Sequence, residues 1–276
     1  MFFGQEFFWN ALLAGLFAGV SCSLVGAFVV TMHLSFLGVC IAHAAFAGAL
    51  MGVWLGFDPL AGALCYSLAA SALVGPLSDR GELSPDASIG IIFSLTIGLA
   101  FLFLGLAPGS HTEALSLFWG NILTVSRSDL LLLGGVSAAI VIGMVLFNKE
   151  IHATACHRPV ATAVGIPATL VFYGMLFATG VTIAVSLRAI GGLLIYCLVI
   201  NPAASAMQIT YRFNRMLAIS AFFGAGACWA GLLASYVWDL PAGATIVVVS
   251  SLVFAVCTAL SPKKKGMSWK RADSAG

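Results

Sequence analysis

The stretch FLGVCIAHAAFAGALMGVWLG, residues 36–56, decides the fold class. It contains one histidine, His43, and no other ionisable group except a cysteine, Cys40. An α-helix needs about 20 apolar residues to cross a hydrocarbon core of roughly 30 Å. We therefore interpret this stretch as a membrane-spanning helix with an imidazole close to the middle of the membrane.

The composition of the whole chain is typical of a polytopic membrane protein. Of its 276 residues, 61% are apolar and 8% are charged, and the mean hydropathy is +1.07. Soluble domains carry roughly 25% charged residues, so a soluble globule of this size would lack solvating charge. The apolar runs are continuous, which excludes a β-barrel built from alternating segments of about ten residues.

Hydropathy predicts an all-α transmembrane bundle of eight or nine helices. The first ten residues contain no Lys or Arg, so the first segment is expected to be retained as a helix and not cleaved as a signal peptide. The polar stretch 111–128 is expected to form a short interfacial helix. The segments near 168–187 and 190–209 are so close that one of them could be broken or re-entrant. The apolar segments lie near 8–30, 34–56, 58–77, 87–107, 128–147, 168–187, 190–209, 215–237 and 243–261.

Positive charge predicts an orientation with the N-terminus outside and the C-terminus inside. Cytoplasmic loops of membrane proteins are enriched in Lys and Arg. This orientation leaves only Arg127 and Arg188 outside, and it predicts a transmembrane domain over 1–262 followed by a basic cytoplasmic tail over 263–276. The inner loops then hold Arg80, Lys149, Arg158, Arg212, Arg215, Lys263, Lys264, Lys265, Lys270 and Arg271.

His43 is the first candidate for chemistry. A polar group inside a membrane usually faces the bundle interior or a water-filled path, and imidazole is a good ligand for transition metals. The alternative is a histidine satisfied by one interhelical hydrogen bond. At 100° per residue, the face of His43 also carries Phe36, Val39, Cys40 and Ala47, and the opposite face carries Gly48, Gly52 and Gly56. The glycines predict close helix packing, and Cys40 is either a metal ligand or a small packing residue.

Asn201 and Pro202 interrupt another apolar segment. Proline inside a helix removes one backbone hydrogen bond, and broken helices line substrate paths in many transporters. These two residues predict either a broken helix on a transport path or a simple kink.

The remaining polar candidates lie near the ends of the apolar segments. His111 and Glu113 in the outer loop could meet an arriving cation, and His152, Cys156 and His157 in the inner loop could bind a metal. A solvated loop is the alternative in both places. Asp86 and Asp239 precede or begin helices, where an acidic group complements the helix dipole.

The longest inner connection, 148–170, contains an alanine-rich stretch over 160–164 between Pro159 and Gly165. Proline is common at helix starts and glycine at helix ends, so this pattern predicts a short helix at the cytoplasmic surface. An ordinary loop is the alternative.

The chain lacks the short motifs of several enzyme classes. It contains no Gly-Lys-Ser/Thr phosphate loop, so an ATP-driven process would need a separate ATPase chain. It also contains no His-Glu-x-x-His and no Gly-x-Ser-x-Gly motif, so neither a membrane metalloprotease nor a hydrolase is indicated. We expect a transport subunit, not an enzyme.

Six motifs in order resemble the permease subunits of bacterial ABC importers for zinc, manganese and iron. The resemblance covers residues 8–261. The motifs are FLGVCIAHAAFAG, SPDASIGIIFS, LFWGNILTVSRSDLLLL, VATAVGIP, GGLLIYCLVINPAASA and DLPAGATIVVV.

The resemblance implies a permease of the bacterial inner membrane that carries a divalent metal inward by alternating access. It implies a permease homodimer, two ATP-binding cassette subunits and an extracytoplasmic metal-binding protein, with no nucleic acid and no permanently bound cofactor. His43 would lie on the metal path, with Cys40, His111 and Glu113 as further candidates. Contact with the ATPase would come from Arg158, Pro159, Val160, Ala161, Ala163 and Gly165.

Two departures from the family pattern affect the expected metal. The family usually has Asp four residues before this histidine, where this chain has Val39, and an acidic residue is common where this chain has Arg158. Loss of a hard oxygen ligand beside an imidazole and a nearby thiol favours zinc over manganese. Manganese and iron importers of the same family remain alternatives, as does a permease for a metal chelate. A gradient-driven transporter would want paired intramembrane carboxylates, which no span contains.

Overall fold

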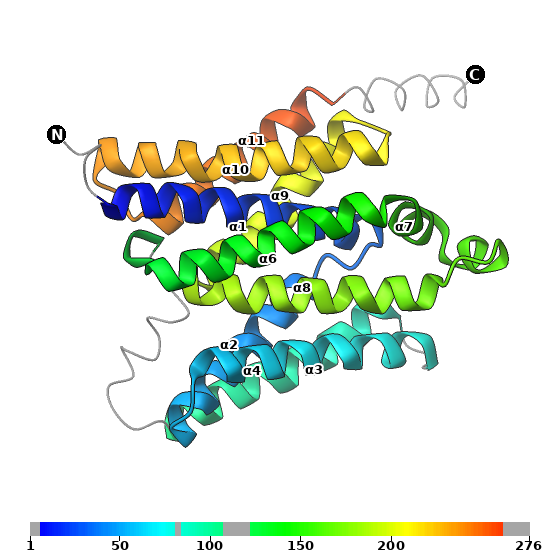
Figure 1. Cartoon of the computed structure of the whole chain (residues 1–276), viewed down its shortest axis with the longest axis horizontal. Coiled ribbons are helices and arrows are strands. Elements are labelled where there is room, and N and C mark those ends of the chain that lie inside the picture. The colour runs from blue at the N-terminus through cyan, green and yellow to red at the C-terminus, as the bar shows by residue number, and fades with distance from the viewer. Residues whose placement is uncertain (1–5, 81–83, 107–121, 262–276) are drawn as a thin grey trace, which may run out of the picture.

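The computed structural model describes residues 6–80, 84–106 and 122–261, and it is an all-helical bundle over these ranges. The long helices lie side by side, with their axes roughly along the long direction of the molecule (Figure 1). The elements are α1 (Glu6–Thr31), α2 (Leu37–Leu55), α3 (Pro59–Arg80), α4 (Pro85–Leu106), a short 3-10 helix η1 (Ile122–Thr124), α6 (Arg127–Leu146), α7 (Asn148–Ala163), α8 (Ala168–Ile190), α9 (Gly192–Ile209), α10 (Phe213–Trp238) and α11 (Ala242–Ala259).

The prediction of eight or nine membrane-spanning helices is confirmed. Within the described ranges, nine helices are long and apolar enough to cross a membrane, and α7 is the helix that is not among them. The predicted segments agree with the helices to within three residues at each end. Hydropathy succeeds here because a helix in hydrocarbon satisfies its own backbone groups and must remain apolar over the full thickness of the membrane.

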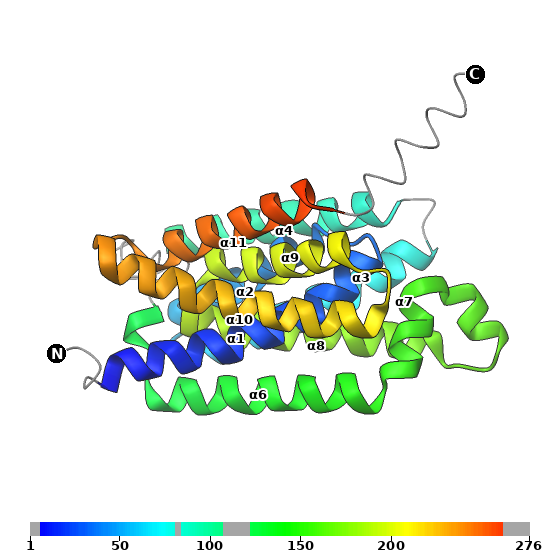
Figure 2. The ribbon, with the colours of Figure 1, turned by 90° about the horizontal axis from the view of Figure 1, so that it is seen from above.

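The helices alternate in direction and bring basic segments to one end of the bundle. At the right-hand end of Figures 1 and 2, α3 finishes, α7 lies and α9 turns into α10. These segments contain Arg80, Lys149, Arg158, Arg212 and Arg215. This grouping is what the positive-inside rule requires of an orientation with the N-terminus outside.

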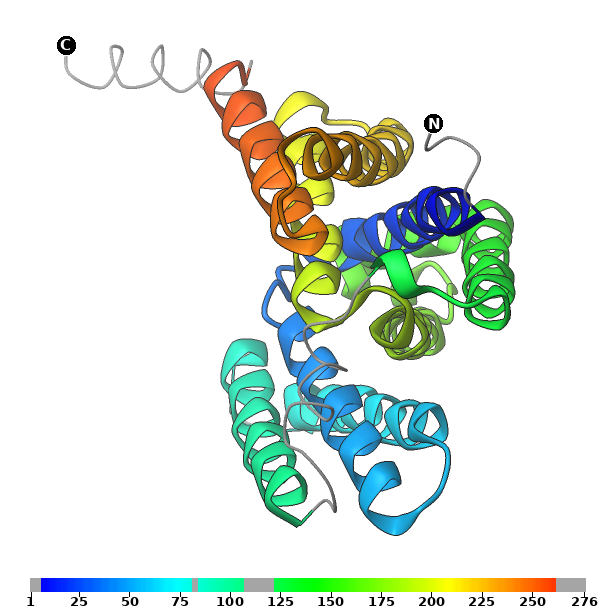
Figure 3. The ribbon, with the colours of Figure 1, turned by 90° about the vertical axis from the view of Figure 1, so that its left-hand side faces the viewer.

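Seen end-on, the bundle has two groups of helices. Figure 3 shows α2, α3 and α4 together, beside a larger group that contains α1, α6 and α8 to α11. The groups meet where α3 and α2 pack against α8 and where α2 also contacts α9. Most of α1 and α2 is buried, so these two helices lie at the centre of the packing.

The close contact between α2 and α3 depends on two glycines. A Cβ atom on Gly48 would collide with the backbone oxygen of Gly62, and a Cβ atom on Gly62 would collide with that of Gly48. The predicted glycine face of α2 is therefore confirmed for Gly48, and Gly52 likewise lies against Pro59. Gly56 has a different role, because it ends α2 with a φ of 74° and has open space around its Cα.

α8 and α9 are separated by a single residue. Gly191 has φ 85° and ψ 157°, a conformation that side chains with a Cβ rarely adopt. Both helices remain continuous, with 23 residues in α8 and 18 in α9. Neither is broken or re-entrant within its bounds.

Two regions named in the sequence predictions fall outside the described residues. Of the predicted interfacial helix over 111–128, the described part contains η1 and the start of α6, where the Ser126 hydroxyl accepts a hydrogen bond from the Asp129 backbone N–H at 3.1 Å. The predicted basic tail over 263–276 also lies outside.

Replacing Gly48 with alanine tests the contact between α2 and α3. We expect Gly48→Ala to lower the thermal unfolding temperature of the full-length chain in detergent, because forced repacking of a tight contact costs about 1–3 kcal/mol. Gly98→Ala in α4 is the matched control, since a Cβ there meets nothing within 4 Å. Equal unfolding temperatures for the two variants would contradict the close-packing argument.

Candidate metal path and coupling segment

The side chain of His43 is held by its own helix. Its Nδ1 lies 2.9 Å from the backbone oxygen of Val39, one turn earlier in α2. A carbonyl oxygen only accepts hydrogen bonds, so Nδ1 carries the proton and donates it. In the neutral ring the lone pair then lies on Nε2, which is the arrangement that metal-binding histidines use when the second nitrogen donates to a carbonyl.

One aromatic ring from α4 lies against the imidazole. The ring centroid of Phe93 is 5.0 Å from that of His43 at an interplanar angle of 80°, and 5.1 Å from that of Phe36. His43 is half-buried, so part of its side chain is open to the surroundings. The packing of the glycine face against α3 therefore turns the imidazole of α2 toward α4.

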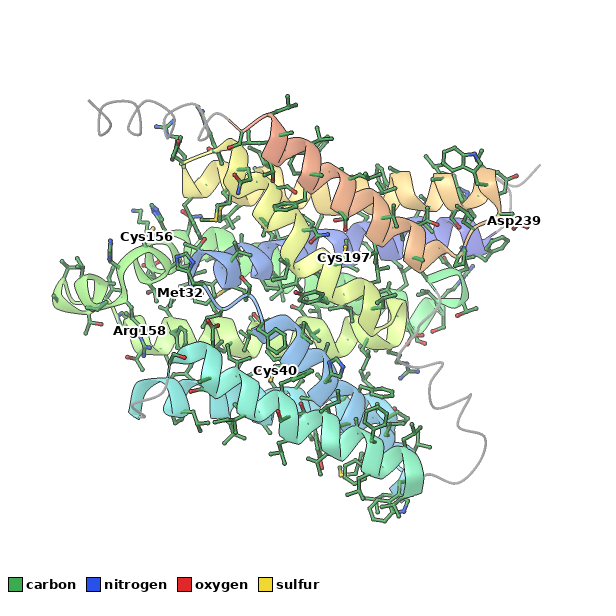
Figure 4. The ribbon with its side chains drawn as sticks, turned by 180° about the vertical axis from the view of Figure 1, so that it is seen from behind. Met32, Cys40, Cys156, Arg158, Cys197 and Asp239 are labelled. Carbon is green, nitrogen blue, oxygen red and sulfur yellow. The ribbon has the colours of Figure 1, made fainter. Side chains whose placement is uncertain are left out.

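Cys40 has a different environment from His43, although the two share a helical face. Its side chain is completely buried within the bundle, in the part of α2 behind α4 in Figure 4. Over the described ranges, no three side chains of His, Cys, Asp or Glu come together as a metal site. A permanent, fully liganded site is thus not formed by the described part of one chain, and His111 and Glu113 lie outside that part.

Of the two alternatives at Asn201 and Pro202, the structure has the unbroken helix and not the broken one, because α9 continues through both residues. Proline removes only one backbone N–H, and the turns on either side keep their hydrogen bonds. The amide Nδ2 of Asn201 lies 3.1 Å from the Ser251 hydroxyl of α11 and 3.4 Å from the Cys197 sulfur. Asn201 therefore connects α9 to α11.

The second part of α7 is a short helix, in agreement with the prediction of a surface helix between 160 and 164. His157 has non-helical dihedral angles, φ −154° and ψ 84°, and divides α7 into two parts. The second part runs to Ala163, and Gly165 follows with a φ of 87°. It projects beyond the bundle at the right-hand end of Figure 1. The side chains of Pro159, Val160 and Ala163 are exposed, whereas Ala161 is buried.

Arg158 ties this short helix to the start of α8. Its guanidinium carbon lies 4.5 Å from the centroid of the Phe172 ring, a cation–π distance, and its Nη2 lies 3.4 Å from the Thr169 hydroxyl. Phe172 in turn lies against Phe28 of α1, with ring centroids 6.3 Å apart. A displacement of the short helix would therefore shift the side chains that it contacts in α8 and, through Phe172, those in α1.

The three polar residues before Arg158 do not form a metal site. The imidazole of His152 stacks on the ring of Phe213 in α10, with centroids 4.9 Å apart and an interplanar angle of 12°. His157 occupies the bend in α7, and Cys156 is exposed. The stacked ring of His152 instead packs α7 against α10.

Three charged residues meet at the opposite end of the bundle. Nε of Arg188 lies 2.8 Å from an Asp129 carboxylate oxygen, and its Nη1 lies 3.7 Å from an Asp58 oxygen. Asp58 and Arg188 also line a cavity of about 250 Å³ between α2, α3 and α8. These contacts join the ends of α6, α8 and the start of α3 on the side predicted to face outward.

Comparison with known proteins assigns the chain to a family. Residues 4–261 match the ABC 3 transport family. The chain belongs to this family.

Named relatives come from several bacteria. The chain is 28% identical over 255 residues to the manganese transport system membrane protein MntC of Halalkalibacterium halodurans, covering 92% of this chain and 87% of that protein. It is 27% identical over 259 residues to the "Probable iron transport system membrane protein" of Haemophilus influenzae, covering 93% and 94%. The structure of PsaBC from Streptococcus pneumoniae in complex with Fab matches with a TM-score of 0.85 at 28% identity, covering 97% of this chain and 96% of that one.

The ABC 3 chain is therefore a multi-pass permease of the bacterial inner membrane and a transport subunit of a metal importer. The preference for zinc drawn from Val39 finds no support in these relatives, since their names specify manganese or iron. The metals named for these relatives are therefore a better guide to the metal than the absence of a carboxylate at position 39.

The outer charge cluster was not predicted from the sequence. Arg188, Asp58 and Asp129 each lie at the edge of an apolar segment, and the alternating helix directions place all three edges on the outer side. The available signals were the position of each residue at the edge of an apolar segment and the direction in which each helix crosses the membrane. They put the three residues at one end of the bundle but did not indicate which pairs would touch.

The pair Arg188–Asp129 can be tested by a double-mutant cycle. The Asp129 side chain is 13% exposed and that of Arg188 is 45% exposed, so we expect Arg188→Ala to cost roughly 1 kcal/mol of stability, reduced by solvent screening. The loss should be smaller in the Asp129→Asn background, because no unpaired carboxylate remains. Thermal unfolding of the full-length chain in detergent measures both effects. Additive losses would mean that the two side chains do not interact.

Proposed function

We propose that this ABC 3 permease carries a divalent transition metal into the cell past His43. The observation that carries the proposal is the geometry of that residue. Its imidazole is half-buried inside a membrane-spanning helix, and the hydrogen bond from Nδ1 to the Val39 carbonyl leaves Nε2 as the metal-binding nitrogen.

His43 would act as a transient ligand. The described residues supply no group of three metal ligands around it, so binding within one chain is weak. Weak binding is what transport needs, because a site that holds its ion too tightly cannot release it. A second permease chain could supply more ligands, and we propose that the working unit contains a permease homodimer.

ATP hydrolysis would take place on partner chains. The chain has no phosphate-binding loop, and its short helix after His157 projects from the end of the bundle predicted to face the cytoplasm. We propose that two ATP-binding cassette subunits press on the exposed residues Pro159, Val160 and Ala163. Arg158 would pass the movement to α8 through Thr169 and Phe172.

An extracytoplasmic binding protein would deliver the metal at the opposite end. Manganese is the preferred cargo in this proposal, with iron as the alternative, and the names of the relatives support this order. Manganese favours oxygen ligands. The first oxygen available beside His43 is the Val39 carbonyl, which already accepts the bond from Nδ1, so other oxygen ligands or water must complete the coordination of the ion.

Replacement of His43 tests the proposed path. In cells that express this chain with an ATPase and a binding protein of a metal importer of the same family, we expect His43→Ala to abolish uptake of radioactive manganese and iron, because the transient ligand is removed. Membrane level and co-purification of the ATPase should remain unchanged. His33→Asn is the matched control, since His33 is an exposed histidine in the connection between α1 and α2, and asparagine tolerates its φ of 58°. Unchanged uptake in His43→Ala would show that the metal passes by other groups.

Replacement of Val39 tests the choice of metal. A carboxylate at this position would lie on the same helical face as His43, one turn away, and would add a hard oxygen ligand. We expect Val39→Asp to raise the ratio of manganese uptake to zinc uptake several-fold, measured with both isotopes in one competition assay. Val39→Asn keeps the size and removes the charge, and it should give a smaller change. A ratio that does not move in either variant would place residue 39 away from the cargo.

A further inference from the structure

An apolar groove runs along the outer surface of the bundle between α1, α6 and α10. It encloses about 420 Å³ and lies near the ends of these helices that are predicted to face the cytoplasm. Figure 2 shows α6 set apart from α10, with α1 between them. The side chains that line the groove include Val20 and Leu24 of α1, Val145 of α6, and Leu217 and Ala218 of α10.

The groove is apolar along its length and polar at one end. Asn148 and Asn214 supply its two polar side chains, and they stand at the starts of α7 and α10. The stack of His152 on Phe213 holds these two helix starts together, with ring centroids 4.9 Å apart. The two amides therefore both line the end of the groove that is predicted to face the cytoplasm.

Positive charge accompanies both amides. Lys149 follows Asn148, Arg215 follows Asn214, and both basic side chains are exposed. Neither makes an ion pair within the described part of the chain. The nearest acidic residue in sequence, Glu150, lies about 200° around α7 from Asn148, and so on the opposite side of that helix.

We propose that this groove binds one anionic phospholipid of the cytoplasmic leaflet. An acyl chain lies between α6 and α10 over α1, and the headgroup phosphate accepts hydrogen bonds from the two amides beside Lys149 and Arg215. The combination of an apolar groove with a cationic mouth matches the chemistry of such a lipid, because each basic residue near the surface attracts the anionic headgroup. The groove adjoins α7, whose far end becomes the short helix proposed to contact the ATPase.

Lipid binding to the full-length chain in detergent micelles can be measured by native mass spectrometry. The probes are phosphatidylglycerol and phosphatidylcholine with identical acyl chains. We expect one phosphatidylglycerol to be retained at concentrations about 25-fold lower than phosphatidylcholine, about fivefold for each of the two charges. Removing both charges in a Lys149→Ala, Arg215→Ala double variant should weaken phosphatidylglycerol binding by about fivefold per charge and leave phosphatidylcholine binding unchanged.

Two controls separate the groove from general surface effects. Arg80→Ala removes a charge at the same end of the bundle from α3, which packs against α2, α4 and α8, and it should leave lipid retention unchanged. Ala218→Trp fills the groove from an exposed position and should reduce retention of both lipids. Ala230→Trp places the same ring at another exposed position of α10, about three turns away, and should have no effect.

Four results would overturn the proposal. The first is equal retention of the two lipids by the parent chain. The second is an equal loss of phosphatidylglycerol in Arg80→Ala and in the double variant. The third is displacement of the lipid by glycerol phosphate at matched concentration, which would mean that the mouth binds phosphate and the groove contributes nothing. The fourth is that Ala218→Trp keeps its lipid but no longer binds a second copy of the chain. That result would assign the groove to a contact between two copies of the protein.

Discussion

The close approach of α2 to α3 at Gly48 and Gly62 is the contact on which the candidate metal path depends. Once the glycine face of α2 is committed to α3, the opposite face must turn toward α4 and the interior of the bundle. His43 lies on that opposite face, so its contact with Phe93 follows from the packing of two residues that carry no side chain. Close packing of helices in a membrane relies on such small residues, since lipid provides no hydrophobic drive for association.

Polar groups inside the bundle are satisfied mainly by their own helices. Ser21, Thr179 and Thr182 each donate to a carbonyl four residues earlier, at 2.7–2.8 Å. His43 uses the same solution through Nδ1, and it differs from a hydroxyl in having a second ring nitrogen. The polar groups that reach across helices are fewer and structurally informative. Asn201 bonds to α11, and Arg188 pairs with α6.

The two ends of the permease are built differently. At the end predicted to face outward, the contacts of Arg188 with Asp58 and Asp129 join three helices by charge. At the other end, the short helix after His157 is held by the contact of Arg158 with Phe172 and projects away from the bundle. A charge-linked outer end and a projecting inner helix fit the proposal that force arrives from the cytoplasm and is passed on through α8.

The sequence alone determined the limits of the apolar segments to within three residues and the glycine face of α2, and it offered the short helix near Val160 as one of two alternatives. Each of these follows from local rules: apolar length, helical periodicity, and the preference of proline and glycine for helix ends. Only the tertiary structure decided that α9 continues through Pro202, that Cys40 is enclosed while His43 is not, and that Arg188 pairs with Asp129. These features depend on how each helix is rotated and which helix lies beside it, and contacts between residues far apart in sequence set both.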